Sequence, residues 1–172
     1  MKKEKLLNIL LIIFGVLTLI ICGVMNLYLI PVIENTTNGI RIFDMNSFGY
    51  SYETARNFVS LLSEKGLKTY LYCQLPLDFI YPVTYTAFFM LALNKLKKGK
   101  KLLMLFPICL MIFDYTENIF SEIMLHNEFS AAVSNAASAV TVCKSLLMYI
   151  TIGLIITLTV IKLLQKNKMK HK

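Results

Sequence analysis

The stretch LLMLFPICLMIFDYTENIFSEIML, residues 102–125, decides the fold of this chain. A helix needs roughly 20 apolar residues to cross about 30 Å of hydrocarbon, and this run is long enough. It also carries Asp114 and Glu117. Ionisable side chains are costly in hydrocarbon and therefore usually face the interior of a helix bundle. The stretch predicts a membrane-spanning helix with one buried polar face.

Three further runs of similar length, residues 6–33, 70–94 and 131–162, predict three more spans. The second run carries Asp78 and the fourth carries Lys144. The chain has 172 residues, of which 56% are hydrophobic, and its mean hydropathy is +0.62. These values predict an all-α integral membrane protein, a four-helix bundle that forms one domain over residues 1–172.

Thirteen lysines flank the predicted spans on one side of the membrane, and they account for much of the net charge of +8. The opposite side has only four basic residues, in the loop 34–69, balanced by acids. The positive-inside rule then predicts a multi-pass protein of the cell membrane with both termini in the cytoplasm and the loop outside. No nucleic-acid partner is indicated. The thirteen flanking lysines are Lys2, Lys3, Lys5, Lys95, Lys97, Lys98, Lys100, Lys101, Lys162, Lys166, Lys168, Lys170 and Lys172.

The loop 34–69 contains the pattern of a short amphipathic helix. Ser51 is suited to cap its start, and Gly66 is expected to end it. Its apolar positions recur at helical spacing, which predicts one face packed on the outer end of the bundle or in the interface. These positions are Ala55, Phe58, Val59 and Leu62.

Helix geometry predicts that the buried charges lie at similar depth. Counting at 1.5 Å per residue from the inner lysine of each span places Asp78 at about 26 Å, Glu117 at about 24 Å and Lys144 at about 27 Å. Asp114 is deeper, at about 20 Å from the inner side. The polar residues of each span also share one face, so they are expected to converge. The stripes are Gln74, Asp78, Tyr81 and Tyr85; Asp114, Glu117, Asn118 and Ser121; and Thr141, Lys144, Met148 and Thr151.

Two interpretations of this cluster remain open. A network of ion pairs around Lys144 would only fix the register of the helices. Three acids against one lysine leave a surplus of negative charge, however. Either one of the acids is protonated, or a cation or a basic ligand joins the cluster, and the surplus therefore favours a binding or catalytic site. The candidate ligand-binding residues are Asp78, Tyr81, Tyr85, Asp114, Tyr115, Glu117, Asn118 and Lys144, and the acids Asp78, Asp114 and Glu117 are the candidate catalytic residues.

No metal or cofactor is predicted. His126 is the only histidine outside the C-terminal tail, which excludes a three-histidine zinc site. The four cysteines form no C-x-x-C motif, which disfavours a membrane dithiol oxidoreductase. Three of them are expected toward the outer side, so one disulfide remains open. These are Cys22, Cys73 and Cys143.

The second span, YCQLPLDFIYPVTYTAFF over residues 72–89, resembles that of the EXPERA family, which includes the emopamil-binding sterol isomerase and the sigma-2 receptor. The likeness extends to four spans, cytoplasmic termini, a long first outer loop and a lysine-rich tail. It implies a pocket for sterols and cationic amphiphiles, in which Asp78, Asp114 and Glu117 would meet the ligand amine. The family's sterol isomerases use tryptophan and a buried histidine, and this chain has no tryptophan.

The sequence therefore favours a small membrane protein that binds a lipid-like or amine-bearing molecule in an outward-facing polar pocket, with isomerase-like acid–base chemistry as an extension. Its other expected partners are membrane lipids. Two alternatives stand beside it. One is an accessory subunit that docks a larger membrane complex through the small residues of 130–139, and the other is a cation- or proton-coupled transporter acting as a homo-oligomer.

Overall fold

The computed structural model describes residues 2–96, 101–126 and 129–170, and every regular element in these ranges is helical. The prediction of an all-helical fold with four long apolar helices is confirmed. Each of the four is long and apolar enough to cross a membrane: Lys2–Glu34, Glu64–Leu96, Lys101–His126 and Ala131–Lys168.

The first two long helices are each interrupted by a π-helical turn. The first comprises α1 (Lys2–Val24), the turn Met25–Leu29 and α2 (Ile30–Glu34), and the second comprises α4 (Glu64–Thr69), the turn Tyr70–Gln74 and α5 (Leu75–Leu96). Each turn lies just before a proline, Pro31 or Pro76. Because proline lacks an N–H and its ring crowds the preceding turn, a wider turn relieves the clash. The two π-helical turns pack against each other.

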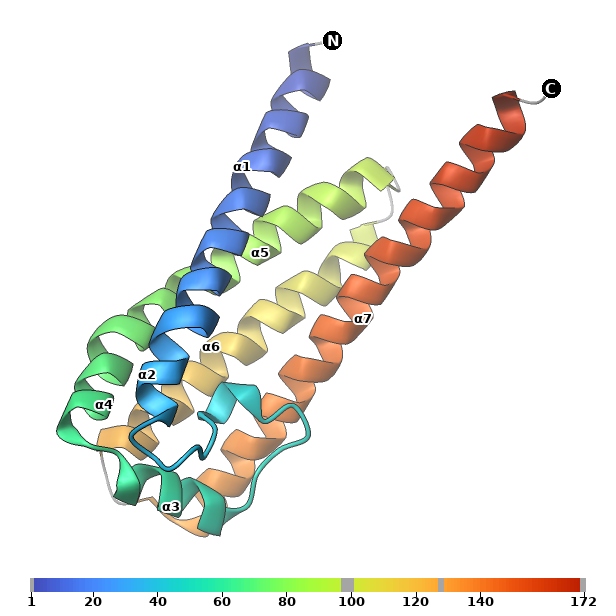
Figure 1. Ribbon diagram of the computed structural model, residues 1–172. Coiled ribbons are helices and arrows are strands. Elements are labelled where there is room, and N and C mark those ends of the chain that lie inside the picture. Colours follow the sequence, from blue (N-terminus) through green and yellow to red (C-terminus); the bar gives the residue numbers. More distant parts are fainter. Residues whose placement is uncertain (1, 97–100, 127–128, 171–172) are drawn as a thin grey trace.

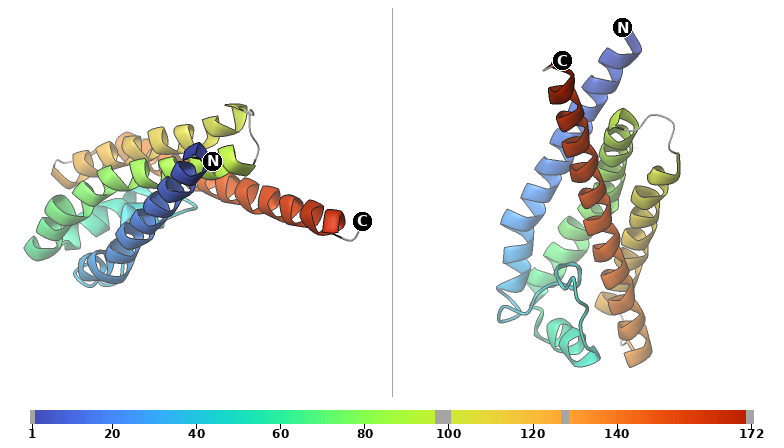
Figure 2. Two further views of the ribbon diagram at one scale, coloured as in Figure 1. Left: turned by 90° about the horizontal axis from the view of Figure 1, so that it is seen from above. Right: turned by 90° about the vertical axis from the view of Figure 1, so that its right-hand side faces the viewer.

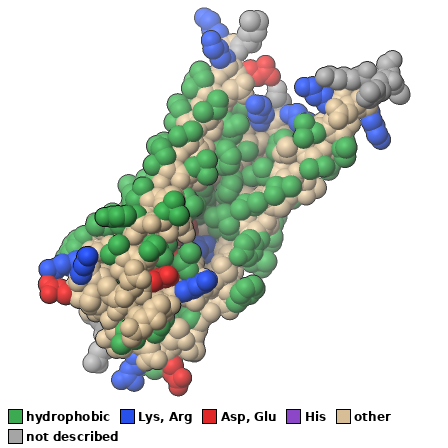
Figure 3. Space-filling view, in the orientation of Figure 1, with side chains coloured by type: hydrophobic (Ala, Val, Ile, Leu, Met, Phe, Trp, Pro, Cys, Tyr) green, Lys and Arg blue, Asp and Glu red, His purple; other side chains and the backbone are tan. Residues whose placement is uncertain are grey.

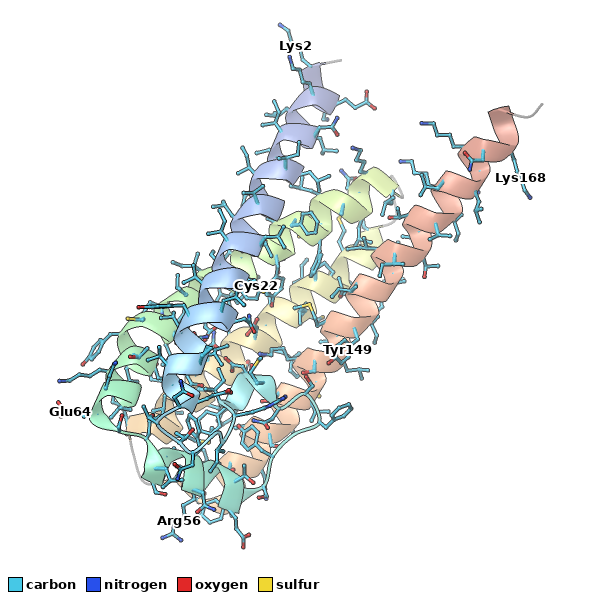
Figure 4. All side chains as sticks on the ribbon, viewed as in Figure 1. Lys2, Cys22, Arg56, Glu64, Tyr149 and Lys168 are labelled. Carbon is cyan, nitrogen blue, oxygen red and sulfur yellow. The ribbon has the colours of Figure 1, made fainter. Side chains whose placement is uncertain are left out.

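The remaining long helices are α6 (Leu105–His126), preceded by the 3₁₀ turn Lys101–Met104, and α7 (Ala131–Lys170). Helix α5 is central, because α1, α6 and α7 all pack against it. Both termini lie at one end of the bundle, the terminal end, and the long loop with α3 (Tyr52–Leu61) lies at the other, the loop end (Figures 1 and 2). Lys2 and Lys168 mark the terminal end, and Arg56 and Glu64 mark the loop end (Figure 4).

The hydrophobic core is concentrated at the loop end. The Phe43 ring lies 5.0 Å from the Phe58 ring and 6.4 Å from the Tyr70 ring, measured between centroids. Toward the terminal end, α1 and α7 diverge (Figure 1), and their apolar side chains stay exposed. Such a surface suits contact with lipid chains. Examples are Leu6, Ile12, Leu19, Ile156, Leu163 and Leu164.

The short helix of the long loop forms as predicted, but it ends earlier. Ser51 Oγ caps α3 by accepting the Thr54 N–H at 3.1 Å, and Ala55 and Phe58 are buried. The expectation that Gly66 ends this helix is wrong, because α3 ends at Leu61 and Gly66 lies inside α4. A Cβ at position 66 would collide with Thr36 Oγ1, so this glycine serves close packing instead.

Candidate functional site

A cavity of about 200 Å³, the acidic cavity, lies toward the loop end between the two π-helical turns, α5, α6, α7 and the long loop. Figure 3 shows a hollow between α1 and α7 with a basic side chain inside it. Three carboxylates are among the polar side chains of the lining. The charged and amide-bearing residues are Asn26, Asp44, Gln74, Asp78, Asp114 and Lys144.

The ammonium group that lines the acidic cavity is already paired. Lys144 Nζ forms an ion pair with Glu117 and lies 3.5 Å from Asp114 Oδ1. Thr141 donates its hydroxyl hydrogen to the other Glu117 oxygen. Glu117 has no exposed surface, so its charge depends on these two partners.

Asp114 is held on both carboxylate oxygens. Its Oδ1 faces Lys144, and its Oδ2 accepts the Tyr85 hydroxyl at 2.7 Å. Tyr85 is fully buried, and its ring meets the Tyr81 ring edge to face at 5.1 Å. Tyr81 lines the acidic cavity, whereas Tyr85 does not line it and holds Asp114 through its hydroxyl group.

Asp78 has no lysine partner among the described residues. Its Oδ2 accepts a hydrogen bond from Gln74 Nε2 at 2.9 Å, and the residue is 5% exposed. The Gln74 Oε1 atom is buried and has no hydrogen-bond partner in the described ranges. The wall at Asp78 and Gln74 thus presents acceptors, some of them unpaired, to the cavity.

Asn118 serves the backbone rather than the cavity. Pro82, one turn after Asp78, has no N–H to donate to the Asp78 carbonyl. Asn118 Nδ2 donates to that carbonyl instead, at 2.7 Å. A neighbouring helix thereby supplies a hydrogen-bond donor to the buried carbonyl that the proline leaves without one.

Tyr115 is a correction to the predicted aromatic wall. Its ring stacks on Phe79 with a centroid distance of 5.9 Å, and its hydroxyl donates to the Phe79 carbonyl at 3.1 Å. It does not line the acidic cavity. The physical reason is that Tyr115 follows Asp114 directly and so points about 100° away around the helix axis.

Asp44 is absent from the predicted site, because it was treated only as one of the acids that balance the basic residues of the loop 34–69. It lies in the 3₁₀ turn Phe43–Met45 of the long loop and lines the acidic cavity. Its Oδ1 is buried without a partner among the described residues. Burial raises the pKa of the Tyr50 phenol, and the nearby charges of Glu117 and Asp44 raise it further. The apolar neighbours Ile42 and Phe43 were the available signal that this turn folds inward.

The long loop is fixed against α7 where it delivers Asp44. The Tyr50 N–H donates to Ser138 Oγ at 2.8 Å, and Tyr149, labelled on α7 in Figure 4, donates to Ser47 Oγ at 3.2 Å. Gly49 has a positive φ of 87°, which favours glycine. The loop therefore forms one wall of the acidic cavity at the loop end.

Asp44, Asp78 and Asp114 thus line the acidic cavity with Lys144, and Glu117 pairs with Lys144 beside it, which gives the cluster a formal charge of −3 when all four acids are ionised. Arrangements of this kind bind a cation or a group rich in N–H and O–H donors. The four cysteines are free, and Cys22, Cys73 and Cys143 form no disulfide with one another. Comparison of the chain with known protein families, with curated proteins and with solved structures found no match.

Proposed function

We propose that this protein is an integral membrane protein that binds the amine head group of a lipid-like small molecule in the acidic cavity. The supporting observation is the excess of carboxylates over Lys144 in a buried site. Asp114 and Glu117 are already occupied by Lys144, Tyr85 and Thr141. Asp78 and Asp44 are therefore the acids that remain to meet a ligand ammonium.

The size of the acidic cavity limits what it holds. Pockets for whole drug-sized ligands usually measure about 300–1,000 Å³. A volume of about 200 Å³ suits an amine with its nearest carbons. The apolar tail would extend between the diverging helices α1 and α7, where the molecule meets lipid. The Tyr81 ring at the cavity wall would add a cation–π contact to the ammonium.

The resemblance of residues 72–89 to the EXPERA family supports the same ligand class. In that family acids meet the ligand amine, and Asp78 lies in the resembling segment and in the cavity wall. If the bound molecule is also a substrate, Asp78 is the one of the three candidate catalytic acids that is free to move a proton, because Asp114 and Glu117 are engaged in ion pairs.

The proposed orientation has both termini in the cytoplasm and α3 outside the cell. A single cysteine at Asn57, which is exposed on α3, should react with an impermeant thiol reagent in intact cells. The background should have the four native cysteines replaced by alanine. Labelling that appears only after lysis would reverse the orientation.

The binding proposal is tested by thermal unfolding in detergent. A long-chain tertiary amine should raise the Tm, since a ligand that binds only the folded state stabilises it, and an uncharged alcohol of equal length should raise it less. Asp78→Asn and Asp44→Asn should each reduce the shift. Glu122→Gln is the matched control, because Glu122 is an exposed acid on the same helix as Asp114 and does not line the cavity.

An aromatic variant separates the cation–π contribution to amine binding from that of the carboxylates. Tyr81→Ala should weaken the amine shift by less than Asp78→Asn does, because a cation–π contact contributes about 0.5–2 kcal/mol. An unmoved melting curve with a panel of amines and lipids would refute ligand binding. The role of an accessory subunit would then be favoured.

A further inference from the structure

A second cavity, the basic cavity, lies at the terminal end of the bundle and measures about 560 Å³. Three long helices supply its walls, since its residues come from α1, α5 and α7. No residue that lines the basic cavity also lines the acidic cavity. The polar and charged residues of its lining are Lys3, Glu4, Asn8, Asn94, Lys95 and Lys162.

Two of the three lysines are held in position by uncharged acceptors. Lys95 Nζ donates to Asn8 Oδ1 at 2.7 Å, which links α5 to α1. Lys162 Nζ donates to the Lys95 carbonyl at 3.0 Å, which links α7 to the last turn of α5. An ammonium group has three donors, so each side chain keeps further donors for another acceptor.

The basic cavity has positive charge to spare. Three lysines and Glu4 give its lining a formal charge of +2. In the described part of the chain, no carboxylate pairs with any of these lysines. The cavity is wide enough for a phosphate and its ester groups, and the two amides of Asn8 and Asn94 offer further donors.

We propose that the basic cavity binds the phosphate group of an anionic phospholipid, independently of the amine site. It lies where the apolar helices end, which in a membrane is the level of the lipid phosphates. Leu7 in its lining, with the exposed apolar surfaces of α1 and α7, continues the site toward the acyl chains. A phosphate held by Lys3 and Lys162 would also join two helices that otherwise diverge.

The test compares two triple variants of equal charge. Lys3→Gln, Lys95→Gln and Lys162→Gln remove the lysines of the basic cavity. Lys5→Gln, Lys101→Gln and Lys166→Gln remove three exposed lysines at the same end that do not line it. Binding of phosphatidylglycerol is measured by native mass spectrometry, with phosphatidylcholine and inorganic phosphate as separate arms.

The cavity triple should bind phosphatidylglycerol about a hundredfold more weakly than wild type, because each lysine near a lipid surface contributes about fivefold, or about 1 kcal/mol. The control triple should change it by much less. The variant with Lys3→Arg, Lys95→Arg and Lys162→Arg should retain binding, which separates loss of the site from loss of the fold. Equal weakening in both glutamine triples would overturn the proposal in favour of diffuse charge. Equal binding of inorganic phosphate would overturn its assignment to a lipid.

Discussion

The two ends of the bundle are built differently from the same four helices. At the loop end the helices are packed around a buried aromatic core, and charged groups lie inside the molecule as ion pairs. At the terminal end α1 and α7 diverge, and lysines line an open cavity without carboxylate partners in the described ranges. Apolar length makes each helix able to span a membrane, but it does not determine where the helices pack.

The difference follows from what fills the space between the helices. At the loop end, the long loop inserts Phe43 and Phe58 against Tyr70. Small residues on α7 also allow close approach, since Ser134 and Ala137 have no exposed surface. The terminal halves of α1 and α7 present large aliphatic side chains that point outward. Substitutions at the loop end should therefore be costly, and equivalent ones at the terminal end should be tolerated.

The largest expected effect is that of Lys144→Met. It leaves Glu117 buried without its ammonium partner, and breaking a buried pair in this way typically costs about 3–5 kcal/mol. Adding Glu117→Gln should recover part of the loss, because the two side chains are in contact. Unfolding in detergent measures both. Lys166→Met, at an exposed position on the same helix, should change stability by less than about 0.5 kcal/mol. Strict additivity of the Lys144 and Glu117 changes would contradict the pairing.

Glycines at the two ends should respond in opposite directions to substitution by alanine. Gly66→Ala should destabilise the protein by about 1–3 kcal/mol, since its Cβ meets Thr36. Gly153, on α7 nearer the terminal end, has nothing within 4 Å of an added Cβ. Gly153→Ala should therefore be neutral or gain up to about 1 kcal/mol from helix propensity. Similar losses at both positions, measured by thermal unfolding, would show that the ends are equally packed.

The hydrogen bond from Asn118 to the Asp78 carbonyl can be isolated by a double-mutant cycle. Asn118→Ala should cost about 1–3 kcal/mol, because it leaves a buried carbonyl unpaired. In a Pro82→Ala background the cost should fall, since the substituted residue supplies the backbone N–H that proline lacks. The unfolding free energies of the four proteins give the coupling directly. Equal costs in both backgrounds would mean that Asn118 does not compensate for the proline.

The smallest effect is expected for the exposed ion pair of α4. Lys68 Nζ lies 2.7 Å from Glu64 Oε1, but both side chains are largely in solvent. Lys68→Met should therefore cost less than about 0.5 kcal/mol and lose even this at high salt. A loss of unfolding free energy as large as that of Lys144→Met would contradict the view that burial, rather than pairing alone, determines how much these lysines stabilise the fold.

The parts of the site that lie on helices were predictable from the sequence. A fixed rise per residue placed Asp78, Glu117 and Lys144 at similar depth and Asp114 deeper, and helical spacing placed the polar residues of each span on one face. In the structure Asp78, Asp114 and Lys144 line one cavity, whereas Glu117 does not line it and pairs with Lys144. Asp44 was missed because an irregular loop has no period from which depth can be counted.

Three other features depended on tertiary contacts that a linear pattern does not contain. Tyr115 packs on Phe79 instead of joining the cavity wall. Gly66 lies inside α4 rather than at a helix end, at a position where Thr36 leaves no room for a side chain. The π-helical turn before Pro76 continues the second long helix back to Glu64, so this helix begins earlier at the loop end than the predicted span 70–94.

The most direct test of amine binding is anomalous diffraction from crystals grown with a brominated cationic amphiphile that carries the bromine beside its amine. The expected result is a bromine peak inside the acidic cavity, with the ligand ammonium within hydrogen-bond distance of Asp78 and Asp44. A well-ordered crystal with no peak there, in which Asp78 and Asp44 have turned onto Lys144, would contradict the proposal. The acidic cluster would then be a self-neutralising network that fixes the register of the helices.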